Sequence, residues 1–153
     1  MGIAITLHIL AVVVWVGGMF FAYLALRPAL ADHDVLNRAR IWAAVFRRFF
    51  PWVWASVVTL LVTGLYMILV NLGGFAQAPM FVHVMMGLGI LMMLLFAHVF
   101  FAPYKRLRQA AAADDEPAAK KSMNQIRKLI AVNLSLGVIV IIVAMTGTFS
   151  FFS

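Results

Sequence analysis

Histidine side chains are the groups in this sequence that are best suited to chemistry. His8 and His83 each lie near the beginning of a long uncharged segment, whereas His33 lies in a charged segment. His98 follows His83 by fifteen residues, which corresponds to about 22 Å along an α-helix. Neutral imidazole binds transition metals and haem iron. His8 and His83 are therefore the leading candidates for a cofactor or metal site, and His98 is a candidate for a second site.

Two imidazoles that face each other across a helical bundle can supply both axial ligands of a b-type haem. The helix face that carries His8 also carries Trp15 and Gly18, and the face that carries His83 also carries Gly87. Small residues leave flat space for a porphyrin, although they also allow close packing of transmembrane helices. The spacing predicts haem b between His8 and His83, with Trp15, Gly18 and Gly87 beside it.

Methionine gives a second interpretation of the same region. The chain contains ten Met residues, and Met80 and Met86 flank His83 within two helical turns. Thioether and imidazole groups are ligands that suit Cu(I). A copper site formed by Met80, His83 and Met86 is therefore the alternative to haem, although Met is also a common filler of apolar cores.

Residue types that are missing from the sequence exclude several kinds of chemistry. Cys is absent, so there is no disulfide, no thiolate metal site and no covalent c-type haem attachment. Every Asp, Glu, Lys and Arg falls within residues 27–48 or 105–128. The uncharged segments thus lack the carboxylates and amines that proton-driven transporters and hydrolases use. No catalytic residue is identified, and an oxidoreductase activity is left open.

The elements that position these residues must be membrane-spanning helices. Of the 153 residues, 65% are hydrophobic and 11% are charged, whereas soluble domains have about 45–50% and about 25%. Long apolar runs favour helices over the alternating strands of a membrane barrel. We predict an all-α bundle of four transmembrane helices, a single integral membrane domain over residues 1–153. Each predicted span has the roughly 20 residues that a bilayer requires; the spans are residues 2–26, 50–70, 80–102 and 129–149.

The distribution of basic residues predicts the orientation of the bundle. All twelve Lys and Arg residues lie in the two charged segments, and the 71–79 connection and both termini carry none. The positive-inside rule places the charged segments in the cytoplasm and both termini outside. His8 and His83 then lie at similar depth near the outer face. The net charge of +7 is explained by orientation and by contact with anionic lipid, rather than by nucleic-acid binding.

Short motifs resemble a known membrane family. The first span contains His8 followed by Trp15, Gly17, Gly18 and Phe20, which gives the order His, then Trp-x-Gly-Gly-x-Phe. Further matching runs are Arg48-Phe49-Phe50-Pro51, Thr63-Gly64 and Val82-His83-Val84. This pattern resembles the CopD-like (copper resistance protein D) membrane family over nearly the whole chain. It is also similar to HemJ, a four-helix protoporphyrinogen oxidase, which has Lys where this chain has Met85.

The resemblance implies a bacterial inner-membrane protein whose functional histidines are His8 and His83, with copper handling or haem chemistry as its role. Combined with the histidine spacing, it predicts a b-type haem protein that serves electron transfer. The alternatives are a Cu(I)-binding protein for copper uptake or resistance, a HemJ-like oxidase, and a haem-free accessory subunit. Membrane lipid is the predicted partner. The redox partner is not identified, and association of identical chains is left open.

Overall fold

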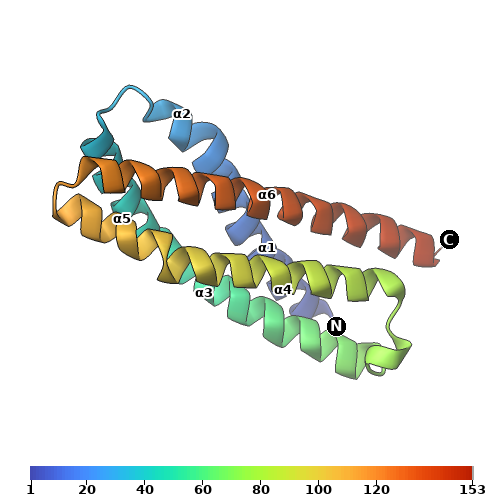
Figure 1. Cartoon of the computed structure of the whole chain (residues 1–153). Coiled ribbons are helices and arrows are strands. Elements are labelled where there is room, and N and C mark those ends of the chain that lie inside the picture. Colours follow the sequence, from blue (N-terminus) through green and yellow to red (C-terminus); the bar gives the residue numbers. More distant parts are fainter. Residues whose placement is uncertain (153) are drawn as a thin grey trace.

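Four long helical segments form the fold. The structure is a computed structural model that describes residues 1–152, and it contains no strand among them. The four helical segments are long and apolar enough to span a membrane, which confirms the predicted all-α bundle of four spans (Figure 1). The elements are α1 (Gly2–Phe21), η1 (Ala22–Leu26), α2 (Arg27–Ala29), α3 (Val35–Tyr66), η2 (Met67–Asn71), η3 (Phe75–Gln77), α4 (Met80–Phe101), α5 (Pro103–Ala112) and α6 (Glu116–Phe152).

The helices extend well beyond the apolar runs that predicted them. The second helix begins at Val35 rather than at residue 50, and the fourth begins at Glu116 rather than at residue 129. These extensions are amphipathic, because Ala39 and Ala119 are fully buried while most of their charged neighbours are exposed. Charged residues interrupt the apolar pattern in these extensions, so apolar runs alone do not predict helices that pack along one face only. The charged connections shrink to residues 30–34 and 113–115.

Glycine and proline set the chain reversals between the helices. Gly73 and Gly74 have φ angles of 79° and 109°, a region that side chains rarely allow. Pro79 is extended and precedes the first turn of α4. At the other end of α4, the backbone leaves helical geometry at Ala102, and Pro103 begins α5. The 71–79 connection and the predicted end of the third span at residue 102 are therefore present as breaks in the helices.

The core of the bundle is aromatic at its charged half. Helix α1 packs against α3, α4 packs against α6, and α5 packs against both α6 and α3. The Phe50 ring lies 5.3 Å from that of Phe96 and 4.9 Å from that of Tyr104, both edge to face. Phe46 stacks on Phe50 with ring centroids 4.7 Å apart. Such pairs are favourable beyond the area that they bury, so they fix the relative position of α3, α4 and α5.

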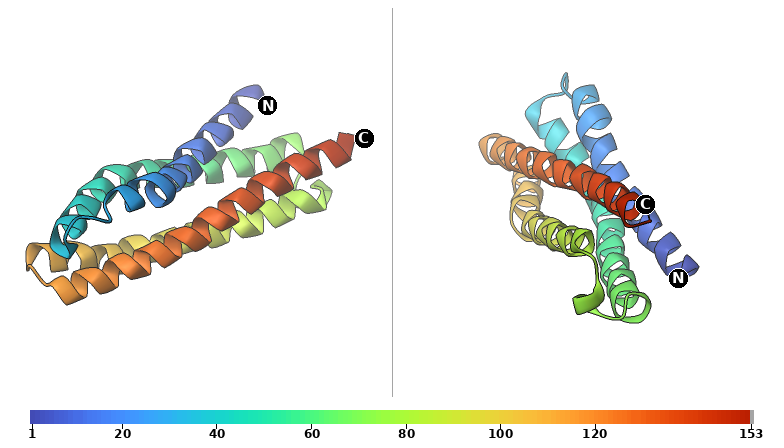
Figure 2. Two further views of the ribbon diagram at one scale, coloured as in Figure 1. Left: turned by 90° about the horizontal axis from the view of Figure 1, so that it is seen from above. Right: turned by 90° about the vertical axis from the view of Figure 1, so that its right-hand side faces the viewer.

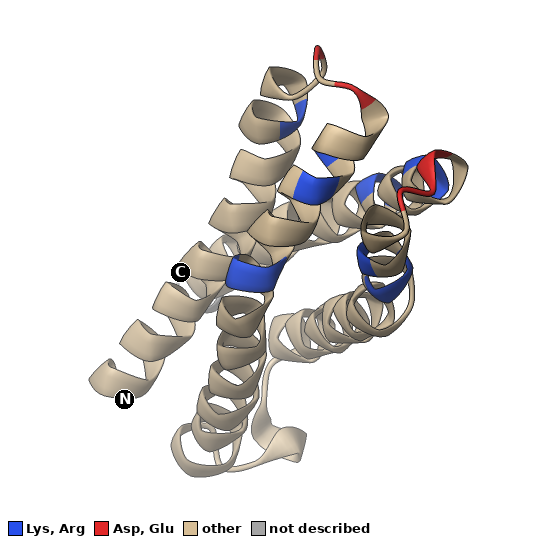
Figure 3. Ribbon diagram, turned by 90° about the vertical axis from the view of Figure 1, so that its left-hand side faces the viewer, with Lys and Arg blue, Asp and Glu red and all other residues tan. Residues whose placement is uncertain are grey.

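The two ends of the bundle differ in charge. Both termini and the 71–79 connection lie at one end, and the 30–34 and 113–115 connections lie at the other (Figure 2). Lys, Arg, Asp and Glu gather toward this second end (Figure 3). We refer to the two ends as the uncharged end and the charged end. Which end faces the cytoplasm stays a prediction from the positive-inside rule.

Candidate metal site at the uncharged end

His8 is held by a hydrogen bond between helices α1 and α3. Its Nδ1 atom lies 2.8 Å from Oγ1 of Thr63. The Thr63 hydroxyl donates its own hydrogen to the carbonyl oxygen of Thr59, at 2.6 Å. Because a hydroxyl has a single hydrogen, Thr63 Oγ1 must accept from His8. The proton of the neutral imidazole is therefore on Nδ1, and the lone pair on Nε2 is available to a ligand.

The residue after Thr63 leaves room for the imidazole ring. A Cβ atom placed on Gly64 would lie 3.5 Å from Cε1 of His8. A larger side chain at this position would compete with the ring for the same space. The Thr63-Gly64 pair thus supplies a hydrogen-bond acceptor and a small surface, which together fix the orientation of the His8 ring.

His83 has a partner of its own on α4. Its Nδ1 atom lies 3.2 Å from the carbonyl oxygen of Pro79, one turn earlier. A carbonyl oxygen only accepts, so Nδ1 of His83 donates and Nε2 again carries the free lone pair. The His83 side chain is exposed. Both histidines of the uncharged end therefore adopt the same tautomer and present Nε2.

Two thioethers accompany His83 on the first two turns of α4. Met80 is 76% exposed, and Met86 is partly buried. Within the part of the chain that the structure describes, no three His, Asp or Glu side chains come together as a metal-binding group. A metal at this end would therefore depend on imidazole nitrogen and methionine sulfur, a donor set that suits Cu(I) and not a hard cation.

The face of α1 that carries His8 points inward, as predicted, but it is filled by protein. Trp15 is only 2% exposed, and its ring packs edge to face on Phe96 with centroids 6.1 Å apart. The space beside Gly18 is occupied by the Phe49 ring, which a Cβ atom on Gly18 would strike. Gly18 thus allows close packing of α1 on α3 and leaves no slot for a porphyrin.

The orientation predicted for α4 is wrong. Gly87, which was expected to face the interior with His83, is exposed, and farther along the same face Ile90 is 44% exposed and Leu94 is 63% exposed. The buried face carries Met92 and Phe96 instead. Because almost every position of α4 is apolar, periodicity could not distinguish the two faces.

The structure does not bring His8 and His83 together. The extensive packing pairs α1 with α3 and α4 with α6, so the two helices that carry these histidines do not pack on each other to a comparable extent. The residues predicted to hold haem b therefore do not fit that group within one chain. His98 is exposed in the last turn of α4, and His33 is exposed in the 30–34 connection. Neither is near the other two histidines.

These observations define a multi-pass membrane protein with imidazole and thioether donors at its uncharged end. A family model described as copper resistance protein D matches residues 43–146, which is more than half of the chain. The chain therefore belongs to the copper resistance protein D family. Searches of curated proteins and of solved structures found no match to the chain.

The sequence did not reveal which residues orient the two histidines. Thr63 is one of several hydroxyl residues in the spans, and it is separated from His8 by 55 residues. Its place in the Thr63-Gly64 motif was the one signal that pointed to it. The carbonyl of Pro79 gave no signal, because a backbone acceptor is present at every residue.

Proposed function

We propose that this protein binds Cu(I) as its cargo at the uncharged end, through His83, Met80 and Met86. The observation that carries the proposal is the tautomer of His83. Its Nδ1 donates to the carbonyl oxygen of Pro79, and its Nε2 is left for a metal. Histidines that bind metals commonly have this arrangement, because the second hydrogen bond fixes the ring and strengthens the ligand.

The donor set agrees with copper in its reduced state. Soft thioethers favour Cu(I) over hard cations, and imidazole accepts copper readily. The two donors that flank His83 lie within two turns of one helix, so a single helical segment supplies all three ligands. Met80 and His83 are exposed, so they are accessible to an incoming metal carrier.

The family supports copper as the cargo over haem as a cofactor. Its description is copper resistance protein D. Haem would require a slot between helices, and the Phe49 ring occupies the space beside Gly18. We propose that the membrane is the inner membrane of a bacterium and that the uncharged end faces outward. Copper arriving from outside would then meet His83 first.

A Cu(I) titration of the detergent-purified protein tests this proposal. The protein competes with a chromophoric Cu(I) chelator under anaerobic, reducing conditions. We expect His83→Ala to weaken Cu(I) binding at least tenfold, and Met80→Leu with Met86→Leu to weaken it as well. His98→Ala and Met145→Leu are the matched controls, because His98 lies in the last turn of α4, fifteen residues after His83, and Met145 is an exposed Met on α6. Unchanged affinity in His83→Ala, or equal losses in the controls, would overturn the proposal.

A further inference from the structure

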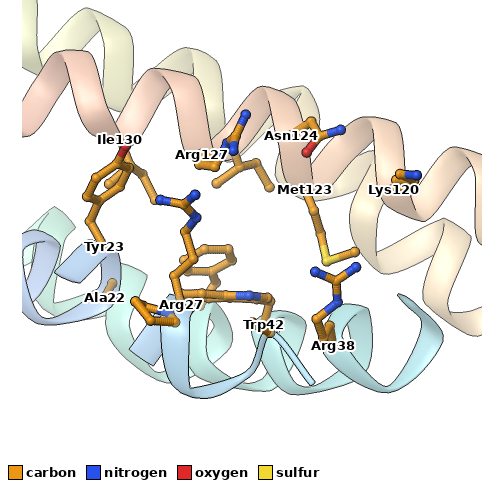
Figure 4. Close-up of a pocket in the computed structure, with 14 residues that line it drawn as sticks. Ala22, Tyr23, Arg27, Arg38, Trp42, Lys120, Met123, Asn124, Arg127 and Ile130 are labelled. Carbon is orange, nitrogen blue, oxygen red and sulfur yellow. The ribbon is translucent and has the colours of Figure 1, made fainter. Parts of the chain in front are cut away.

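A cavity of about 370 Å³ lies at the charged end, between the α1–α2 segment, α3 and α6. Figure 4 shows side chains that line it. Six of these side chains come from three separate parts of the chain: Tyr23 and Arg27 from the first segment, Arg38 and Trp42 from α3, and Lys120 and Arg127 from α6. The cavity is distant in sequence and in space from the histidines of the uncharged end.

The charge of this cavity is entirely positive. Arg27, Arg38, Lys120 and Arg127 line it, and no Asp or Glu is among its lining residues. Within the described residues, the one ion pair joins Arg40 to Asp114, and neither of these lines the cavity. Four cations around one space repel each other unless an anion balances them. The arrangement therefore favours a negatively charged occupant.

One arginine of the cavity is already held in place, and another has a buried donor without a partner. The Arg27 guanidinium lies over the Tyr23 ring, with Cζ 4.9 Å from the ring centroid. The π-helical turn η1 brings these two residues to the cavity, where the N–H of Arg27 bonds the carbonyl oxygen of Ala22. Arg38 Nε is buried and has no hydrogen-bond partner among the described residues. An unpaired buried donor is costly, and an oxyanion in the cavity would satisfy it.

We propose that this cavity binds a phosphate group. Arginine recognises phosphate through paired N–H donors, and lysine adds a point charge. Apart from Tyr23 and Asn124, the remaining lining is mostly apolar and includes Ala22, Phe46 and Ile130, so it suits a molecule that is anionic at one end. Two sources share this chemistry: the headgroup of an anionic phospholipid and a free phosphate in solution. Trp42 beside the cavity is of the type enriched at membrane interfaces.

The test uses two double variants with the same loss of charge. Arg38→Gln with Arg127→Gln removes two cations from the cavity. Arg48→Gln with Lys128→Gln removes two exposed cations that do not line it. Binding is measured by native mass spectrometry with phosphatidylglycerol against phosphatidylcholine, and by thermal shift with inorganic phosphate. A third variant, Arg38→Lys with Arg127→Lys, keeps the charge and reports whether the region still folds.

We expect the wild type and the control variant (Arg48→Gln with Lys128→Gln) to bind phosphatidylglycerol in preference to phosphatidylcholine. In the cavity variant (Arg38→Gln with Arg127→Gln), the ratio of bound phosphatidylglycerol to bound phosphatidylcholine should fall at least tenfold. This result identifies lipid as the source. A soluble phosphate is identified as the source if two results coincide. Inorganic phosphate stabilises the wild type and the control variant but not the cavity variant, and none of the proteins prefers phosphatidylglycerol. Equal losses in the two pairs would show that general charge attraction is responsible and would overturn the proposal. Absence of binding by either probe to the wild type would overturn it as well.

Discussion

Thr63 on α3 accepts a hydrogen bond from His8 on α1, with Oγ1 and Nδ1 2.8 Å apart. The same hydroxyl donates to the carbonyl of Thr59, so its role as acceptor is fixed. This pair joins two helices near the uncharged end and sets the tautomer of the imidazole. In an apolar environment, each of these two atoms needs the other as its hydrogen-bond partner, because no water is present to replace either one.

Loss of the Thr63 hydroxyl should therefore weaken the bundle through His8. Thr63→Val keeps the shape of the side chain but removes the acceptor, and we expect the free energy of unfolding to fall by about 1–3 kcal/mol. Thr63→Ser keeps the hydroxyl and serves as the control. In a double-mutant cycle with His8→Ala, the two losses should be non-additive by about 0.5–3 kcal/mol. Additive losses, measured by unfolding in detergent, would show that the two side chains do not interact.

The absorption spectrum distinguishes copper from haem. If the protein carries copper and no haem, the purified protein should lack sharp Soret and α bands in both the oxidised and the dithionite-reduced state. The physical reason is the packing of Phe49 beside Gly18 and the outward face of His83. Reduced low-spin haem bands that disappear in both His8→Ala and His83→Ala would contradict this prediction and restore the two-histidine haem site.

The contact between Gly18 and Phe49 predicts opposite effects at two adjacent glycines. A methyl group at position 18 would strike the Phe49 ring, whereas at position 17 it meets no other atom within 4 Å. We expect Gly18→Ala to destabilise the fold by about 1–3 kcal/mol through overpacking. Gly17→Ala should be neutral or stabilising by about 0.5–1 kcal/mol, because alanine favours the helix. The thermal unfolding midpoint of each variant checks the difference.

A second substitution shows whether Phe49 is the cause. Combining Gly18→Ala with Phe49→Leu removes the ring that the new methyl group would strike. The pair should then be less destabilised than the sum of the two single variants. If Gly17→Ala and Gly18→Ala have the same midpoint, α1 does not pack on α3 as closely as the structure has it.

The sequence was sufficient for the architecture because the relevant signals are local. Three uncharged runs, the second of them divided by the glycines at 73 and 74, are sufficient to place four spans. The charged extensions were missed because Arg38 and Ala39, adjacent in sequence, have different surroundings in the fold. Ala39 is fully buried, while the Arg38 side chain reaches the cavity at the charged end. The packing of α3 against α5 and α6 accounts for the buried face of that segment.

The candidate site was less predictable, because it depends on helix rotation. The inward face of α1 was identified correctly from the small and aromatic residues next to His8. On α4, Leu94 and Phe96 are equally apolar, yet one is 63% exposed and the other is 4% exposed. Lipid and a protein core are both apolar solvents, so hydrophobicity alone does not separate these faces. The hydrogen-bond partners of the two histidines required the three-dimensional structure.

The sidedness of the bundle can be measured directly because the chain has no Cys. Single Cys substitutions at Gln77, in the 71–79 connection, and at Ala113, in the turn before α6, place one thiol at each end; both positions are exposed. Basic residues flank position 113 on both sides in sequence, and none lies within the 71–79 connection. The positive-inside rule therefore predicts that position 77 faces outward and position 113 faces the cytoplasm.

In intact cells, a membrane-impermeant maleimide should label Gln77→Cys and not Ala113→Cys. After permeabilisation, it should label both, which controls for the reactivity of the thiol at position 113. The reverse pattern would place His8 and His83 on the cytoplasmic side, because they lie at the same end as position 77. The copper ligands would then receive their metal from inside the cell, and the direction proposed for copper entry would be wrong. The ligand set itself would be unaffected, because the titration that defines it does not depend on sidedness.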